Sequence, residues 1–322
     1  MKDFLTRVLL GLLTGWIIVF YGEFVFWATP EREGMDLGGI LAVWLVYSLL
    51  SSIFLCVVSV FRVRSAAAVF LAGAFYGWLE EGVLVQTMYG SEAGPFPVSI
   101  AFTGLAWHAL LDVFVGWYLV RKALGEPRPL RALGLASAIG LFYGLWAVWW
   151  WNEPPGPMKA LLEAGRKDLL FLRFAVFSFA TTGVLVLVHR LYNKVMPFAF
   201  TPSRGELWGL GGATVLYFAL VTVPVAPRAL WVLPPLLGIT FWALNRNRQT
   251  ETKPDAICGL RSTVSLGRYL TLFLIPLIAS GIYFFALAGD LRLSTNKVVY
   301  VLSSALGTLG WLVSLILVAR RR

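Results

Sequence analysis

The chain has 322 residues, of which 58% are hydrophobic, and a formal net charge of +10. Its mean hydropathy of +0.76 and its long uninterrupted apolar runs exclude an ordinary soluble globular protein. The positive charge does not indicate a nucleic-acid partner, because the Lys and Arg residues collect in alternate loops between the apolar runs. Such a distribution is typical of proteins that cross a membrane several times.

Ten apolar segments are each close to the roughly 20 residues that a helix needs to cross a bilayer. They lie at about 5–29, 37–61, 66–89, 98–120, 131–151, 169–189, 206–225, 229–245, 266–288 and 298–319. The sequence therefore predicts an all-α, polytopic transmembrane helix bundle with about ten spans, located in the cell membrane. The segment at 229–245 is the shortest of these predicted spans.

Lys and Arg residues favour one set of loops over the other. One set includes Arg62, Arg64, Lys122, Arg246 and Arg320, whereas the opposite loops carry few basic residues. Cytoplasmic loops of membrane proteins carry the excess of positive charge. This asymmetry predicts that both termini lie in the cytoplasm, which agrees with an even number of spans.

The polar loop at 194–205 separates the first six predicted spans from the last four. We therefore predict a six-helix membrane domain at 1–193, a linker at 194–205 and a four-helix membrane domain at 206–322. Cys56 lies within a predicted span and Cys258 in a loop, so we expect no disulfide between them. Neither cysteine has the spacing of a metal ligand, and the sequence predicts no metal site and no cofactor.

Ionisable side chains lie inside two consecutive predicted spans. Glu80 and Glu81 belong to Gly-Trp-Leu-Glu-Glu at 77–81, and His108 and Asp112 belong to Trp-His-Ala-Leu-Leu-Asp at 107–112. Ionisable groups at membrane depth are costly and usually mark a pathway or a reactive site. His108 and Asp112 are about one helical turn apart, so Asp112 is placed to orient the imidazole.

Two stripes of small and ionisable residues, each with a spacing of four, run through these spans. They are Gly73, Gly77 and Glu81 in the first span and Gly104, His108, Asp112 and Gly116 in the second. Small residues at this spacing let membrane helices approach closely. We therefore expect both faces to be buried in protein and to pack against each other.

The depth of the ionisable residues agrees with this pairing. The turn at 90–97 joins the two spans, with Glu81 nine residues before it and His108 eleven residues after it. At about 1.5 Å per residue, both lie roughly 14–17 Å from the same membrane surface. A bilayer core is about 30 Å thick, so the pair is expected near mid-depth.

Two further charged residues are candidates for binding a substrate. Glu23 lies in the outer half of the first predicted span, and Arg173 lies near the outer end of the sixth. An Arg at such a position ordinarily extends its guanidinium to the lipid headgroups. The sharper alternative is that Arg173 pairs with Glu23, Glu80 or Glu81.

Glu80-Glu81 on one helix, followed by His108-x-x-x-Asp112, resembles the CAAX-protease and bacteriocin-processing family of glutamic intramembrane proteases. The segment from His108 to Leu119 is also similar to the His motif of the PrsW proteases, and the resemblance covers roughly residues 66–120. It implies a glutamic-type intramembrane peptidase, a hydrolase whose substrate is a membrane protein or a peptide. The chain has Val85 where the family's Glu-Glu-x-x-x-Arg motif has Arg, and Gly104 where its Phe-x-x-x-His motif has Phe.

For a hydrolytic site reached from the outer side, the residues take distinct roles. Glu81 is the first choice for a general base, because it shares a helix face with the glycine stripe, and Glu80 is the second choice. His108 is expected to bind the reacting oxygen or to share the proton, and Asp112 to fix the ring. His189-x-x-x-Asn193 matches a further motif of the same family in residue types and spacing. It lies at the cytoplasmic end of its predicted span, however, so we expect it outside the cluster.

Other interpretations of the same cluster stay open at this point. Buried Glu, Asp and His also relay protons or bind cations in secondary transporters, so a proton- or cation-coupled small-solute transporter is the main alternative. Another alternative is a non-catalytic membrane scaffold whose helices are held together by a buried cluster of polar side chains. A Zn²⁺ site is a variant of the hydrolytic interpretation. Membrane lipids are expected partners in every case.

Overall fold

The computed structural model describes residues 2–29, 34–90, 94–195, 200–260 and 262–321. Helices make up almost all of this part of the chain, and it contains no β-strand. Parts of the predicted turn at 90–97 and of the predicted linker at 194–205 lie outside the described residues. The all-α bundle predicted from the apolar segments is confirmed.

Ten long helical rods follow one another along the chain, some of them containing π-helical or 3-10 turns. They are α1 (Lys2–Val19) with η1 (Phe20–Phe24) and α2 (Val25–Trp27), α3 (Leu37–Val60), α4 (Ala66–Leu79) with η3 (Glu80–Leu84), η5 (Ile100–Leu119) with α5 (Val120–Gly125), α6 (Pro129–Asn152), α8 (Lys167–Val195), α9 (Arg204–Tyr217) with η6 (Phe218–Thr222) and α10 (Val223–Val225), α11 (Ala229–Thr250), α13 (Leu266–Leu270) with η7 (Thr271–Phe273) and α14 (Leu274–Ala288), and α15 (Thr295–Ala319). Shorter helices are η4 (Thr87–Tyr89), α7 (Gly156–Glu163) and α12 (Ala256–Gly259).

Nine of the rods in the described part of the chain are long and apolar enough to cross a membrane. The tenth, α11, contains the predicted span at 229–245 and has 22 residues, with Pro234 and Pro235 inside it and Asn-Arg-Asn-Arg after its apolar part. The chain is therefore a multi-pass membrane protein. That α11 also spans stays a prediction from its length and sequence.

Contacts at the helix ends place both ends of the chain on one face of the bundle. Arg7 in the second turn of α1 pairs with Glu206 at the start of α9, with a 2.8 Å nitrogen–oxygen distance. The Asn247 amide at the end of α11 donates to the carbonyl of Phe61 at 3.0 Å and accepts from Arg321 at 2.9 Å. Because the predicted basic loops meet here, this is the face that the positive-inside pattern assigns to the cytoplasm.

The α11 rod runs from the opposite face toward this one. Its first turn lies beside the turn that follows η4, where the Arg228 guanidinium stands 5.7 Å from the Phe96 ring. Its last turns hold the loop after α3 through Asn247. This course agrees with an even number of crossings, and the cytoplasmic location of both termini stays a prediction from charge asymmetry.

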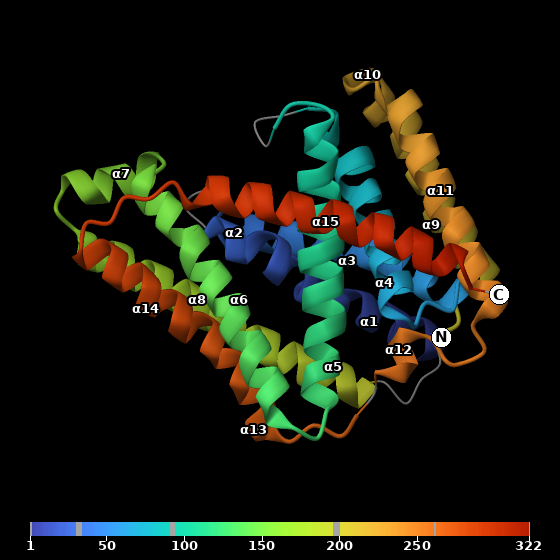
Figure 1. The fold of residues 1–322 in the computed structure, drawn as a ribbon, viewed down its shortest axis with the longest axis horizontal. Coiled ribbons are helices and arrows are strands. Elements are labelled where there is room, and N and C mark those ends of the chain that lie inside the picture. The colour runs from blue at the N-terminus through green and yellow to red at the C-terminus, as the bar shows by residue number, and fades with distance from the viewer. Residues whose placement is uncertain (1, 30–33, 91–93, 196–199, 261, 322) are drawn as a thin grey trace.

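The η5 rod occupies the centre of the bundle, with α15 crossing over it (Figure 1). The α4, α1 and α15 rods contact it, and glycines permit the closest approaches. A Cβ atom on Gly77 would collide with the backbone of Gly104, and one on Gly73 would lie 3.0 Å from Ala109. The predicted packing of the two small-residue stripes against each other is confirmed.

The last four rods pack against the first six. The α14 rod lies along α6 and α8, α15 lies on η5 and α4, and α11 lies on α4. Gly140 of α6 marks one such seam, because a Cβ there would stand 2.9 Å from the Ile275 carbonyl oxygen. The predicted division at 194–205 is therefore not visible as a break in the packing.

Candidate functional site

All five of the acidic and imidazole side chains predicted to form the site lie on π-helical turns. Glu23 belongs to η1, Glu80 and Glu81 to η3, and His108 and Asp112 to η5. A π-helical turn is rare and frequently occurs at functional sites, because its wider winding redirects side chains and frees backbone carbonyls. The unusual backbone and the ionisable side chains therefore coincide.

Polar side chains from other segments bind the backbone that η3 leaves free. The Thr222 hydroxyl in η6 donates to the carbonyl of Val83 at 2.6 Å. The Gln86 amide donates to the carbonyl of Leu84 at 2.5 Å. Buried carbonyls without partners are costly, so these bonds stabilise the C-terminal end of the rod formed by α4 and η3.

The His108 imidazole lies between two carboxylates. Its Nε2 atom is 2.7 Å from Glu81 Oε1, and its Nδ1 atom is 2.7 Å from Asp112 Oδ2. Glu80 approaches the same ring, with its Oε2 atom 3.3 Å from Nδ1. The predicted convergence of Glu81, His108 and Asp112 within hydrogen-bond reach is confirmed.

The π-helical turn brings both glutamates to the imidazole. In a regular α-helix, consecutive side chains diverge by about 100°, so only one of the two would face η5. Here Glu81 reaches the Nε2 side of the ring and Glu80 the Nδ1 side. The ranking of Glu81 over Glu80 agrees with the shorter distance, but both belong to the same cluster.

Two tyrosines complete the walls of the cluster. The Tyr47 hydroxyl in α3 donates to Glu23 Oε1 at 2.7 Å, and its ring centroid is 6.4 Å from that of His108. Tyr76 stands one turn before Glu80 in α4, with its ring centroid 5.8 Å from that of His108. Nothing in the sequence analysis pointed to these tyrosines. Their positions within predicted spans could have indicated them, because a phenolic hydroxyl buried in a membrane span needs a hydrogen-bond partner.

The close approach of η1 to η5 depends on Gly22. A Cβ atom at this position would stand only 2.6 Å from Asp112 Oδ2, so a larger residue would displace the carboxylate. The Trp107 indole donates to the carbonyl of Gly22 and joins the same two segments. Glu23 follows directly, and in this way the first rod is held against the cluster.

The cluster is closed to solvent. The exposed fraction is 3% for Glu80, 9% for Glu81, 1% for His108 and 0% for Asp112. Within the described residues, Glu81 Oε2 and Asp112 Oδ1 are buried and have no hydrogen-bond partner. Unpartnered buried polar atoms are uncommon and indicate a water, a proton or a ligand.

The charges of the cluster do not balance if every group is ionised. One imidazolium balances a single carboxylate, whereas four carboxyl groups, including that of Glu23, lie around it. Isolated buried charges are strongly unfavourable, so protons must be shared among these groups. The site is therefore suited to proton transfer.

The structure does not bring every candidate residue together. None of the ion pairs in the described part of the chain joins Arg173 to Glu23, Glu80 or Glu81. Glu23 belongs to the cluster through Tyr47 rather than through His108. Where the chain is described, no group of three or more His, Cys, Asp and Glu side chains has a geometry suited to a metal ion.

The second histidine lies elsewhere, as predicted. His189 is buried near the end of α8, and the neighbouring Asn193 amide donates to the Tyr269 hydroxyl at 2.7 Å. His189 lies near the end of its rod, as expected, and its side chain is enclosed by protein. It makes no contact with the His108 cluster.

Comparison with family models, with curated proteins and with solved structures gives no match to this chain. What the site can do is therefore argued from its own geometry.

Proposed function

We propose that this protein is an intramembrane hydrolase in which Glu81, His108 and Asp112 activate water against a membrane-embedded peptide. The observation that carries the proposal is the imidazole held between two carboxylates at 2.7 Å on each side. A carboxylate, an imidazole and an orienting acid in contact are the parts that general acid–base hydrolysis needs.

Each residue has a role that follows from its contacts. Asp112 accepts the Nδ1 proton of His108, which orients the ring so that Nε2 faces Glu81. The unpartnered Oε2 atom of Glu81 takes a proton from the attacking water. The water oxygen bonds to the acyl carbon, the amide C–N bond breaks, and Glu81 returns the proton to the leaving nitrogen. The positive charge of protonated His108, whose two N–H groups stay on Asp112 and Glu81, stabilises the negative oxygen that forms in between by electrostatic attraction.

An apolar groove between η5, α6 and the first rod suits a hydrophobic substrate, and none of the cluster residues lines it. Leu111 and Val115, which flank Asp112 along η5, form one wall, and Tyr21 and Val25 of the first rod form another. The groove has a volume of about 200 Å³. Because the chain is a membrane protein, an apolar peptide segment is the class of substrate that such a lining favours.

The geometry, rather than the family motifs, supports the proposal. A Cβ atom on Gly104, where the resemblance would require Phe, would stand 2.7 Å from the Trp78 ring. An aromatic side chain therefore has no room at this position. Val85, which stands in the place of the motif's Arg, is 48% exposed and follows the last residue of η3.

The decisive experiment uses the purified full chain in liposomes and a library of fluorogenic peptides, each carrying an apolar segment of about 20 residues. In water enriched in ¹⁸O, a hydrolase incorporates the label into the new carboxyl group of a cleaved peptide. We expect Glu81→Gln to lower the cleavage rate by about 10²–10⁴-fold, the usual contribution of a general base. Glu163→Gln on the exposed helix α7 is the control and should cleave like the parent. A folded Glu81→Gln protein with unaltered cleavage contradicts the proposal.

Proton- or cation-coupled transport is the second candidate, and one observation favours it. Beyond the His108 triad, the Tyr47 ring centroid stands 6.4 Å from that of His108 and the Tyr47 hydroxyl donates to Glu23, so titratable groups of four rods lie next to one another. Buried chains of this kind relay protons in transporters. Liposomes loaded with a pH-sensitive dye separate the two functions: a solute-dependent proton flux that Glu23→Gln abolishes, without peptide cleavage, favours the transporter. If Glu81→Gln and Glu23→Gln lower only the unfolding temperature, the cluster serves to stabilise the fold and the protein is a scaffold.

A further inference from the structure

A second polar site lies on the face where both ends of the chain meet, well away from the His108 cluster. A cavity of about 530 Å³ opens between the turn that precedes α4, the end of α5 and the segment around α12. Its volume is within the range of about 300–1,000 Å³ that is usual for small-molecule sites. Arg64, Lys122 and Lys253 supply three cationic side chains to its wall.

The cationic groups of the cavity are free to take an anion. Within the described residues, Arg64, Lys122 and Lys253 form no ion pair. The Arg64 guanidinium donates one hydrogen bond to the carbonyl of Pro254 at 2.8 Å, which leaves further N–H groups available. Lys122 stands 5.8 Å from the Tyr118 ring centroid. Unpaired cations that share one concave wall attract a common counter-ion.

The two carboxylates that line the cavity are engaged by arginines outside it, and the Asp255 carboxylate at its rim accepts hydrogen bonds from the backbone of Ile257 and Cys258. Glu126 Oε2 lies 2.5 Å from Arg131 Nη1, and Glu251 Oε2 lies 3.7 Å from Arg321 Nη1. Arg268 donates to the carbonyl of Pro127 at 2.9 Å and covers the end of α5. The remaining charge of the cavity wall is therefore positive.

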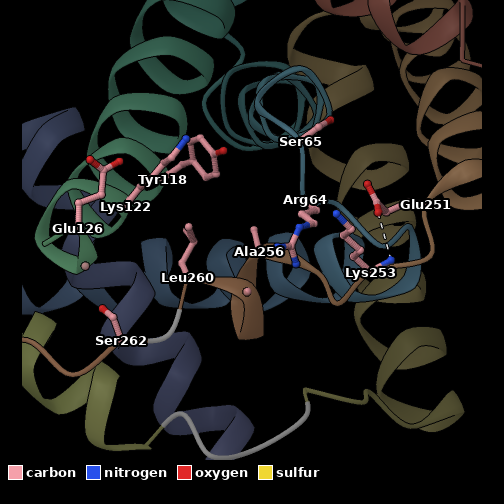
Figure 2. A pocket seen from close by; sticks show the side chains of 12 residues that line it. Arg64, Ser65, Tyr118, Lys122, Glu126, Glu251, Lys253, Ala256, Leu260 and Ser262 are labelled. Atoms are coloured by element: carbon pink, nitrogen blue, oxygen red, sulfur yellow. Dashed lines mark hydrogen bonds between the residues drawn. The ribbon is translucent and has the colours of Figure 1, made fainter.

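The arrangement of the side chains gives the cavity two ends. Figure 2 shows Arg64 close to Lys253 at one end and Tyr118 with Lys122 at the other, and Ala256 and Leu260 lie between them. Arg64 and Lys253 together match an anion with several oxygens, because guanidinium and ammonium groups bind phosphate from different directions. The apolar middle has room for a part of the ligand without charge.

The backbone of the cavity adds two features that favour an anion. The helix formed by α4 and η3 begins at the wall, with Ser65 as its N-terminal cap, and the positive end of its dipole lies there. At Gly259 the absence of a side chain lets Arg64 approach, since a Cβ atom there would stand 2.8 Å from Nη1. Hydrogen bonds such as that from Ala256 N to the Val63 carbonyl, at 2.7 Å, hold the two walls together.

We infer that this cavity binds a phosphate-bearing anion through Arg64 and Lys253, with Lys122 at the far end. A phosphate group satisfies the charge, the number of donors and the two-ended shape, and its sources are a lipid headgroup at the membrane surface or a free phosphate compound. The inference does not depend on the hydrolytic site.

Two binding experiments on the purified full chain test the inference and separate the two sources. The first measures the unfolding temperature in neutral detergent as inorganic phosphate or glycerol phosphate is added. The second measures the unfolding temperature of the protein reconstituted in nanodiscs of phosphatidylcholine with increasing amounts of phosphatidic acid or with none. The Arg64→Gln/Lys253→Gln variant should bind roughly 25-fold more weakly, because each basic residue near a surface contributes about fivefold to the binding of an anion.

The matched control is Arg246→Gln/Arg248→Gln, which removes the same charge from exposed positions at the end of α11 on the same face. It should bind like the parent. Lys122→Gln/Lys253→Gln is the second test variant, because it leaves the Arg64 bond to Pro254 intact and so avoids any effect on folding. Response to phosphatidic acid alone identifies a lipid headgroup, and response to soluble phosphates identifies a free ligand. Equal losses in the control and the test variants, or no binding by the parent, overturn the inference.

Discussion

The His108 cluster and the basic cavity are two polar sites in one apolar bundle, and they treat charge in opposite ways. The cluster gathers carboxyl groups around an imidazole, away from solvent, where each charge needs a partner or a shared proton. The cavity leaves Arg64, Lys122 and Lys253 without carboxylate partners at an open surface. Water stabilises the free cations of the cavity, whereas nothing but neighbouring side chains stabilises the cluster. The His108 cluster is suited to proton transfer, and the basic cavity is suited to binding an anion.

The largest expected effect comes from removing one ionisable group at each site. His108→Ala leaves Glu81 and Asp112 buried without their partner, and breaking such a buried pair costs about 3–5 kcal/mol of stability. Lys122→Gln at the cavity removes an exposed charge and should change stability by less than about 0.5 kcal/mol. Equilibrium unfolding in mixed micelles measures both. Equal losses of stability in His108→Ala and Lys122→Gln would show that solvent reaches the His108 cluster.

A smaller loss is expected where the glycine stripes meet. Gly77→Ala places a methyl group against the Gly104 backbone, and overpacking of this kind costs about 1–3 kcal/mol. Gly211→Ala in α9 is the control, because no atom lies within 4 Å of a Cβ there. The same unfolding experiment compares them. A Gly77→Ala protein as stable as the control contradicts the close approach of α4 and η5.

The tyrosines give a finer comparison between the two sites. Tyr47→Phe removes the 2.7 Å hydrogen bond to Glu23, and we expect it to lower stability by about 1 kcal/mol. Tyr118→Phe at the cavity removes a hydroxyl that binds no carboxylate in the described structure and should have a lesser effect. If the order is reversed, Tyr47 does not support the cluster as the structure indicates.

The smallest effect concerns pH at the rim of the cavity. Burial raises the pKa of Asp255 above its ordinary value, although hydrogen bonds from the backbone of Cys258 and Ile257 oppose the shift. A raised folded-state pKa means that the folded protein holds the proton more tightly than the unfolded chain does. The stabilisation is therefore complete below the unfolded pKa and is lost as pH rises through the folded one.

Asp255→Asn isolates this pH effect, because Asn also caps helices well and keeps the start of α12. The variant should flatten the fall in unfolding temperature from about pH 4 upward, the ordinary range of an Asp carboxyl. Thermal unfolding at stepped pH is the measurement. An unchanged slope would assign the pH dependence to another group.

Local patterns were sufficient for the long helices and for the choice of the ionisable residues that cluster. Apolar length predicted nine spans that the structure contains. Glycines at a spacing of four predicted that α4 and η5 pack together, because that spacing lies on one helix face whatever the partner is. Glu81, His108 and Asp112 were recognisable for the same reason, since an ionisable residue in an apolar run has few explanations.

Arg121 shows where local patterns fail. Its position next to Lys122 after an apolar run indicates a basic cytoplasmic segment and gives no sign of burial. In the structure it is 5% exposed, with its guanidinium 4.2 Å from the Tyr192 ring centroid and 4.8 Å from that of Trp117. Tyr192 comes from α8, so the burial depends on a contact between distant segments that no local pattern contains.

The sequence by itself therefore determined the class of protein, the course of its helices and the residues of the acidic cluster, because hydrophobicity and helical spacing are local properties. Only the tertiary structure decided how these residues meet. The π-helical turn in η3 turns both Glu80 and Glu81 toward His108, and Tyr47 enters from α3. The basic cavity exists only because the turn before α4, the end of α5 and the segment around α12 converge. Such convergence is set by packing between segments far apart in the chain, which periodicity along the chain does not encode.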